Sequence, residues 1–296
     1  MMGKKARLGI CAATATLAAV AVAGCSGSGS SGGTNAGGGT KAGSGDSAAI
    51  SLVADAMNKA DSAGTVKVTG TMSAPGMSTP MTINAEEQYS PSVAMSMSLQ
   101  IEGQTLSEIL VGNVIYMDYP ALSAELGSGK QWMEINLAKV TSLGSLSSLL
   151  DSARNDNPTT QIAALVASGS VTKVGTETVQ GQQTTHYAGD LDASQLLSAG
   201  NTASNLTPSQ LSSLKDEIKS AGVSTVKVDL WVASDGLPVE EKYSEKTTAG
   251  TVVGDLYMSD WGAPVSVGAP PASEVTDMTS QINAEASATA SPAAAG

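Results

Sequence analysis

The longest strictly alternating run of apolar residues constrains the fold of this chain more than any other feature. Val93, Met95, Met97, Leu99 and Ile101 are separated by single residues that are small or polar. Successive side chains of a β-strand point to opposite faces, so this pattern predicts a strand with one apolar and one solvated face. A sheet built from such strands has to cover its apolar face with another layer.

Shorter runs of the same kind recur along the chain, whereas helical spacing is confined to a few segments. The alternation predicts strands near residues 66–68, 81–85, 93–101, 106–111, 114–119, 132–135, 171–174, 177–179, 184–188, 226–232, 239–247 and 251–261. Helices are expected over 50–60, 137–150, 162–166 and 207–222, the last beginning with a capping-box-like Thr207-Pro208 and ending at Gly222. Strands that follow one another without long helices pair antiparallel, so we predict an α+β fold with one large antiparallel sheet and helices on one side.

The first residues have the features of an export signal. Lys4, Lys5 and Arg7 precede an apolar run, and Ala23-Gly24 stands directly before Cys25. This small pair before a cysteine resembles the bacterial lipobox, which implies cleavage before Cys25 and acylation of its thiol. The alternatives are an ordinary secretory signal or a membrane-spanning helix, but the apolar run is shorter than the ~20 residues that span a bilayer.

The composition along the chain predicts four parts. Residues 1–24 form the signal peptide, and 25–46 form the acylated cysteine with a flexible Gly/Ser linker. Residues 47–278 form the folded domain, and 279–296, rich in Ala, Ser and Thr, are expected to be a disordered tail. The predicted location is the cell membrane, with the protein lipid-anchored on its extracytoplasmic face.

Charge and cysteine content exclude several functions. Without residues 1–24 the chain has 12 basic and 27 acidic residues, a formal net charge of −15 in place of −12. An acidic body disfavours nucleic-acid binding, because phosphates need basic partners. Cys11 leaves with the signal and Cys25 is expected to carry lipid, which leaves the folded domain without disulfides, cysteine nucleophiles or thiolate metal sites.

No group of residues predicts catalysis. His186 is the one histidine, but it lies in a Thr-Thr-His-Tyr strand without a Gly-x-Ser-x-Gly elbow, so a structural role is expected. The pairs Asp190/Asp192 and Asp229/Asp235 suit strand ends and turns better than a metal site. Isolated strand tryptophans usually pack, although they can also contact carbohydrate; these are Trp132, Trp231 and Trp261. We therefore predict no enzyme activity, no metal and no cofactor.

The later half has an order of features that resembles a known family. Segment 174–181 (VGTETVQG) leads to 184–192 (TTHYAGDLD) and, after a helical stretch, to 228–238 (VDLWVASDGLP). With the lipobox and the linker, this resembles the actinobacterial LppX/LprG lipoproteins, whose fold is similar to that of the lipoprotein carrier LolA. The resemblance implies a curved half-barrel sheet with helices packed on its concave face around an apolar pocket.

The same resemblance implies a ligand and a task. Members of the family bind acylated lipid or glycolipid and help to move it through the cell envelope, which makes a membrane transporter a possible partner. The alternatives are a lipid-sensing regulatory lipoprotein and a surface interaction protein without a transport role. Because phenylalanine is absent, aliphatic residues and methionine would line a pocket, and such residues can equally form ordinary core. The candidate pocket strand contributes Val93, Met95, Met97 and Leu99.

Overall fold

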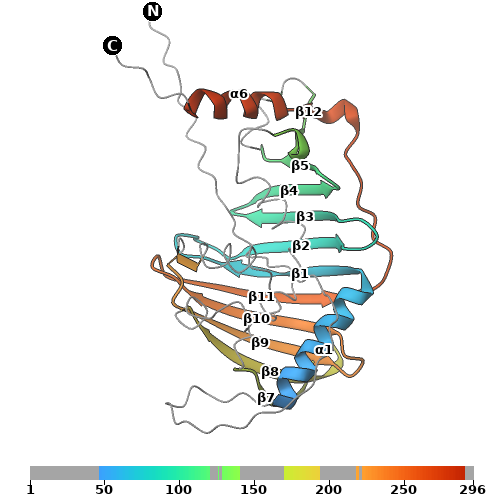
Figure 1. The fold of residues 1–296 in the computed structure, drawn as a ribbon, viewed down its shortest axis with the longest axis vertical. Coiled ribbons are helices and arrows are strands. Elements are labelled where there is room, and N and C mark those ends of the chain that lie inside the picture. Colours follow the sequence, from blue (N-terminus) through green and yellow to red (C-terminus); the bar gives the residue numbers. More distant parts are fainter. Residues whose placement is uncertain are drawn as a thin grey trace, which may run out of the picture.

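The computed structural model describes residues 47–120, 126, 129–140, 170–193, 218–219 and 222–290. They form a twelve-stranded sheet in the order β12-β6-β5-β4-β3-β2-β1-β11-β10-β9-β8-β7, which is open because its two end strands do not meet (Figure 1). The α+β class and the large antiparallel sheet predicted from the sequence are therefore confirmed.

The elements have the following bounds. The strands are β1 Thr65–Ser73, β2 Met81–Gln88, β3 Ala94–Ile101, β4 Gln104–Val111, β5 Val114–Asp118, β6 Trp132–Asn136, β7 Thr172–Val179, β8 Gln182–Asp192, β9 Thr225–Ala233, β10 Pro238–Lys246, β11 Thr251–Ser259 and β12 Val275–Asp277. The α-helices are α1 Ser47–Ala63 and α6 Thr279–Ala290, and the 3₁₀ helices are η2 Leu137–Lys139 and η3 Ala272–Glu274.

Two meanders make up the sheet. One runs from β1 to β6 and the other from β7 to β11, and all pairs within them are antiparallel. The meanders join where β1 pairs with β11, with Gly70 opposite Leu256. The short strand β12 adds to the far edge in parallel with β6, a pairing that the local sequence pattern did not predict.

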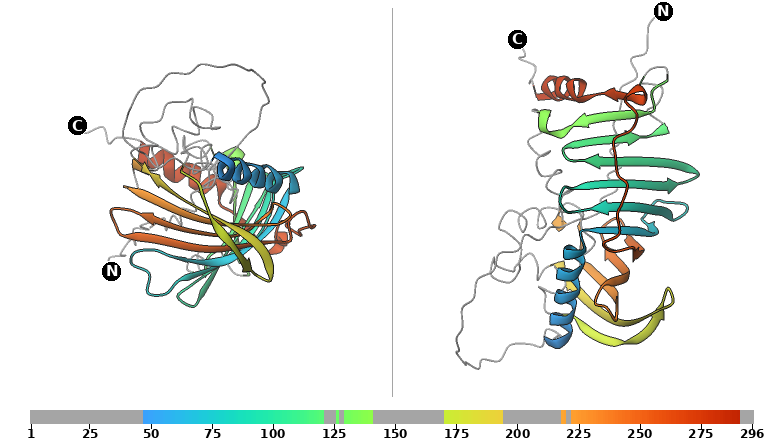
Figure 2. Two further views of the ribbon diagram at one scale, coloured as in Figure 1. Left: turned by 90° about the horizontal axis from the view of Figure 1, so that it is seen from below. Right: turned by 90° about the vertical axis from the view of Figure 1, so that its right-hand side faces the viewer.

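Helix α1 lies on one face of the sheet, which we call the inner face; the opposite face is the outer face. In the end-on view the sheet curves around the side on which α1 lies (Figure 2). The helix buries Val53, Met57 and Ala60 among the apolar side chains of the sheet. At its other side Lys59 donates a hydrogen bond to the backbone carbonyl of Asp235 in the β9–β10 turn.

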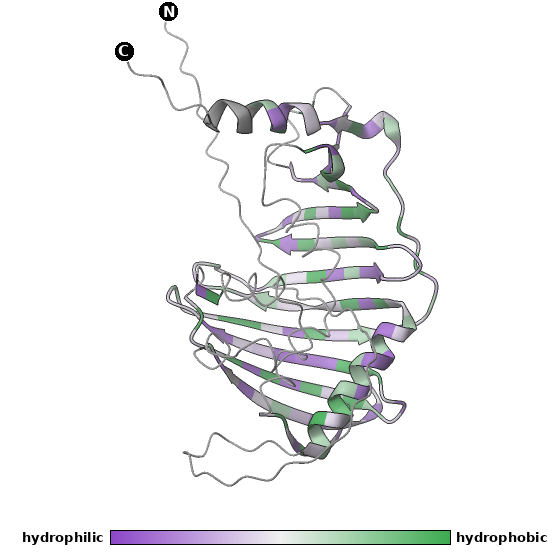
Figure 3. Cartoon of the chain, in the orientation of Figure 1, coloured by the Kyte–Doolittle hydropathy of each residue, from purple (hydrophilic) through white to green (hydrophobic). Residues whose placement is uncertain are grey.

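The alternation seen in the sequence places most apolar side chains of a strand on one face of the sheet and most polar side chains on the other. Apolar and polar residues alternate along most strands (Figure 3), and most buried apolar residues of the strands pack into one cluster with α1. The turn at Gly112 has a positive φ of 61°, which a glycine adopts without strain, as expected for the predicted Gly-Asn turn.

Two local predictions were wrong. The strand break expected at Gly175 is a register shift, so β7 continues from Thr172 to Val179 through an irregularity. The tail predicted to be disordered from Thr279 is helical as far as Ala290. The helix begins where the Asp277 carboxylate accepts a hydrogen bond from the Thr279 backbone N–H at 2.9 Å, and Asn283 bonds to the backbone carbonyl of Lys139. Tertiary anchoring of an Ala-rich segment explains the difference.

Other predicted elements fall partly or wholly outside the described residues. These are the signal peptide and linker, residues 121–125 and 127–128, and the expected helices over 141–150, 162–166 and 207–217. The described end of the last helix agrees with the prediction. Val223 donates its backbone N–H to the carbonyl of Ile218 at 2.9 Å, and Gly222 has a φ of 63°, as in a glycine-terminated helix.

Candidate ligand-binding face

The strand register defines which residues share the inner face. In one row across the sheet, Leu99 of β3 lies opposite Ile83 of β2, and Ile83 lies opposite Gly70 of β1. The row continues through Leu256 of β11, Glu241 of β10, Leu230 of β9 and Tyr187 of β8. Nearly every position in this row is apolar. The inner face is therefore continuously hydrophobic across the neighbouring strands β3, β2, β1, β11, β10, β9 and β8.

Burial divides this face into two regions. In the neighbouring strands β1, β11, β10 and β9, which lie near α1, most inward side chains are buried, as Val68, Leu230 and Met258 show. From β3 to β6, many inward side chains are only half-buried. The half-buried set, which we call the methionine region, consists of Met95, Met97, Ile101, Leu106, Ile115, Met117, Met133 and Ile135. Partly exposed apolar surface that extends beyond a buried core is typical of a binding surface.

The structure places the predicted pocket strand in this region. Met95, Met97 and Leu99 lie on the inner face of β3, opposite Glu87, Ala85 and Ile83 of β2. Leu99 is buried in the core, Met97 packs against that core, and Met95 is half-buried.

The fourth residue of the candidate set, Val93, is also half-buried and directly precedes the strand. Its carbonyl accepts the backbone N–H of Gly112. Whether these four residues contact a ligand stays a prediction.

Carboxyl groups interrupt the apolar surface at a few points. Glu87 lies on the inner face, where burial raises its pKa to about 7 although the Tyr89 hydroxyl donates to Oε2. Glu108 lies between Met97 and Met117, and burial raises its pKa as well. An acid that is neutral near pH 7 can donate a hydrogen bond, which an ionised carboxylate cannot do.

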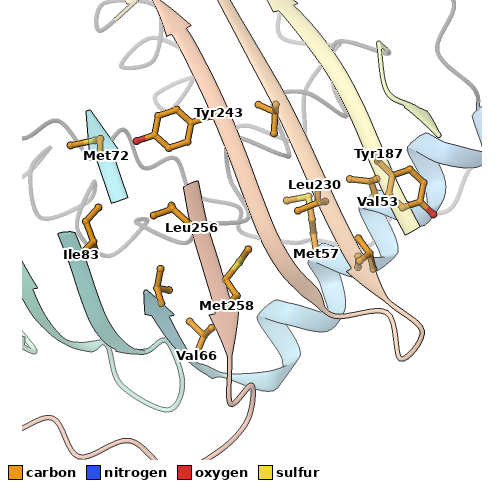
Figure 4. Close-up of a cluster of buried hydrophobic side chains, with 14 of the residues drawn as sticks. Val53, Met57, Val66, Met72, Ile83, Tyr187, Leu230, Tyr243, Leu256 and Met258 are labelled. Carbon is orange, nitrogen blue, oxygen red and sulfur yellow. The ribbon is translucent and has the colours of Figure 1, made fainter. Parts of the chain in front are cut away.

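The most buried of these acids is Glu241 on β10. Its side chain lies between Leu256 and Leu230 in the register, and the residue is 2% exposed. Burial raises its pKa to about 8. Tyr243, two residues further along the same strand, is also on the inner face, and burial raises the pKa of its phenol above the ordinary range. Figure 4 shows Tyr243, Leu256 and Met72 close together in this cluster.

Glu241 and Tyr243 were not predicted as site residues. The Val-Glu-Glu-Lys-Tyr segment reads as a solvated strand when its charges are considered alone. The burial of Glu241 becomes evident only from the strand register. Tyr243 lies in the core, and the residue two positions before it on the strand points to the same buried face.

The outer face has a different character around His186. Its ring stacks on Trp231 with centroids 4.3 Å apart, and Nζ of Lys242 lies 4.9 Å from the centre of the Trp231 ring. Nε2 of His186 is 2.7 Å from Oδ1 of Asp229, and Nδ1 is 3.2 Å from Oε1 of Glu177. The same oxygen of Glu177 accepts the indole N–H at 2.6 Å. The histidine thus ties β7, β8 and β9 together, in agreement with the structural role expected for it.

The remaining candidate residues are spread over the sheet. Asp235 accepts the backbone N–H of Leu237 at 3.0 Å, which is turn chemistry, and Asp190 faces Lys227 at 3.8 Å. Asp192 is exposed at the end of β8, and Trp132 is half-buried on β6. Trp261 donates its indole N–H to the carbonyl of Pro238.

In the part of the chain that the structure describes, no three His, Cys, Asp or Glu side chains come together as a possible metal site. None of the helices that the structure describes combines the length and the apolarity that a bilayer span requires.

Comparison with known sequences gives relatives in Streptomyces. The chain is 36% identical over 161 residues to an uncharacterised 31.2 kDa protein of Streptomyces griseus, covering 53% of this chain and 51% of that protein. It is 25% identical over 156 residues to a Streptomyces coelicolor protein whose name marks it as a candidate lipoprotein, covering 52% and 45%. The chain therefore spans about half the length of the curated relatives it matches. No protein-family model matches it.

A solved lipoprotein is among the structures that the chain resembles. LprF from Mycobacterium bovis has a TM-score of 0.46 at 16% identity, covering 77% of this chain and 99% of LprF. Lipoprotein LppX from Mycobacterium tuberculosis has a TM-score of 0.47 at 19% identity, covering 75% and 100%. A LolA superfamily protein from Nitrosomonas europaea has a TM-score of 0.25 at 10% identity, covering 74% and 94%. These likenesses concern the course of the chain alone.

Proposed function

We propose that this protein is a membrane-anchored lipoprotein that binds the acyl chains of a lipid or glycolipid on its inner face. The observation that carries the proposal is the methionine region. Here the apolar inner face extends beyond the buried core near α1, and its side chains from β3 to β6 are half-buried. Acyl chains are apolar, so they could cover this surface and be shielded from water by it.

The chemistry of the face favours flexible hydrocarbon over a rigid ligand. Each methylene group removed from water contributes about 0.8 kcal/mol, so a single long acyl chain can supply most of the binding free energy. Methionine side chains adapt their shape readily, and Met95, Met97, Met117 and Met133 all lie on the inner face. A surface of this kind would select ligands by chain length and volume.

The amino-terminal segment would bring this surface to a membrane. With Cys25 acylated, the linker over 26–46 has a root-mean-square reach of about 25 Å as a flexible chain. The acidic domain would not be attracted to anionic headgroups, so the acyl chains would hold it at the membrane. The protein could then collect lipid from that membrane and present it to a partner in the envelope.

Two paired variants test lipid binding. The double variant Met95→Asp/Met97→Asp places charges in the methionine region, whereas Ser98→Asp/Gln100→Asp places two charges on the outer face of the same strand. Native mass spectrometry of protein purified from an actinobacterial host measures the lipid that each retains. We expect lipid on the wild type and on the outer-face variant and none on the inner-face variant. Equal lipid content in both variants, or none on the wild type, would contradict the proposal.

A further inference from the structure

One acidic side chain lies inside the methionine region itself. Glu108 is on the inner face of β4, where the register sets it opposite Met97 of β3 on one side and Met117 of β5 on the other. Leu106 and Leu110, two residues before and after it, share this face of the strand. An acyl chain that lies on the methionine region would therefore pass beside a carboxyl group.

The carboxyl of Glu108 is open to a ligand. The residue is half-buried, and the burial that it has among apolar side chains raises its pKa. In the described ranges no hydrogen bond or ion pair engages this carboxyl, whereas Oε2 of Glu87, the other acid of this part of the face, accepts the hydroxyl of Tyr89. Packing alone would favour an apolar residue between two methionines, because a partly desolvated acid is unfavourable there.

Tyr119 adds a second protic group beside Glu108. Burial and, to a smaller extent, the charge of Glu108 raise the pKa of the Tyr119 phenol to about 12, so the two groups lie near each other. The phenol therefore stays protonated at neutral pH and can both donate and accept a hydrogen bond. A carboxyl and a phenol together suit a ligand group that also donates and accepts, such as a hydroxyl.

We propose that Glu108 determines which lipids bind, because it forms a hydrogen bond with a hydroxyl group next to the acyl chains and disfavours lipids that carry a phosphate there. This inference rests on the proposed lipid binding and specifies the polar group of the ligand. A hydroxyl suits both forms of the carboxyl, since the neutral form donates or accepts and the ionised form accepts. An ionised phosphate oxygen only accepts, and an ionised carboxylate repels it.

Two lipids that differ only in a phosphate group test the inference. Dioleoylglycerol has a free hydroxyl where dioleoylphosphatidic acid carries its phosphate. Equal amounts of both are offered to the full-length protein in detergent micelles at pH 7.5, and native mass spectrometry counts the protein molecules that retain each lipid. We expect the wild type to retain about tenfold more dioleoylglycerol, the factor that a hydrogen bond to a charged group contributes.

Three variants assign the preference to one side chain. Glu108→Gln keeps the size and the hydrogen bonding of the side chain without its charge, so retention of the phosphate lipid should rise about tenfold while that of dioleoylglycerol changes little. Glu108→Lys should reverse the preference, because an ammonium group attracts phosphate. Glu134→Lys is the matched control, since Glu134 lies on the outer face of β6 opposite Tyr116 and the substitution changes the net charge equally.

The outcomes separate this inference from the proposed function. If the wild type and Glu108→Gln retain the two lipids in the same ratio, Glu108 does not select the ligand and lipid binding stands. The same conclusion follows if Glu134→Lys shifts the ratio as much as Glu108→Lys does. If the wild type retains neither lipid, both proposals are contradicted. Glutamine has nearly the shape of glutamate, so Glu108→Gln is expected to fold, and circular dichroism checks this.

Discussion

Replacing Glu241 by glutamine should change how the stability of the protein depends on pH. Burial raises the pKa of this carboxyl from its ordinary value near 4.5 to about 8 in the folded protein. Between these two values the folded state holds a proton that the unfolded state has released, so stability falls as pH rises. The fall is about 1.4 kcal/mol per pH unit, and it sums to about 5 kcal/mol as an upper bound. Above pH 8 both states are ionised and the contribution becomes constant.

Glutamine has nearly the same shape and does not titrate, so this part of the pH dependence should disappear in Glu241→Gln. The assay is urea unfolding of wild type and variant from pH 4 to pH 9, followed by tryptophan fluorescence. The difference in free energy of unfolding between them should grow in favour of the variant as pH rises through this range. Glu87, with a pKa of about 7, leaves a smaller slope in both proteins.

A control separates burial from charge. Glu102 is an exposed carboxyl in the turn between β3 and β4, and Glu102→Gln should leave the wild-type profile unchanged. If Glu241→Gln and the wild type keep a constant difference from pH 5 to pH 9, the carboxyl is not neutral in the folded protein. The argument from burial would then be refuted.

Three further predictions address packing, the outer face and the anchor. Gly254→Ala should lower stability by about 1–3 kcal/mol because its Cβ meets a tyrosine ring, and Gly175→Ala, with open space around it, should be nearly neutral in the same urea titration. His186→Ala removes the stacking on Trp231 and both carboxylate contacts, so we expect a loss of about 1–2 kcal/mol and unchanged lipid uptake; a loss of uptake at unchanged stability would contradict the structural role. Cys25→Ala should bind lipid normally but lack the covalently attached acyl chains that mass spectrometry detects on the wild type, whereas a wild-type Cys25 without attached lipid would disprove the lipobox assignment.

Local alternation in the sequence predicted most of the strands, because the period of two records which face of a strand is apolar. It did not predict the pairing of β1 with β11 or the strand β12, since both depend on residues that are distant in sequence. Val275–Asp277 is too short to show a period, and it becomes a strand only because β6 offers an edge.

The site was predicted less completely than the fold. The apolar run from Val93 to Leu99 could be found by its pattern, because apolar side chains reveal a buried face directly. Glu241 could not, because a carboxyl in a strand normally faces solvent and only the register with Leu230 and Leu256 shows that it is buried. The disordered tail was predicted from composition, whereas the helix α6 depends on tertiary contacts such as that between Asn283 and Lys139.

The seam between β1 and β11 has a consequence for how the chain folds. Its register joins Gly70 to Leu256, so the centre of the sheet needs residues from both ends of the domain. Each meander can form hairpins early, but closing the seam brings together segments with most of the domain between them, which slows folding. If the proposed signal peptide exports the chain unfolded and amino terminus first, β1 emerges long before its partner β11. The first meander would then keep an unpaired central edge until export is nearly complete, and it would need protection from aggregation during that interval.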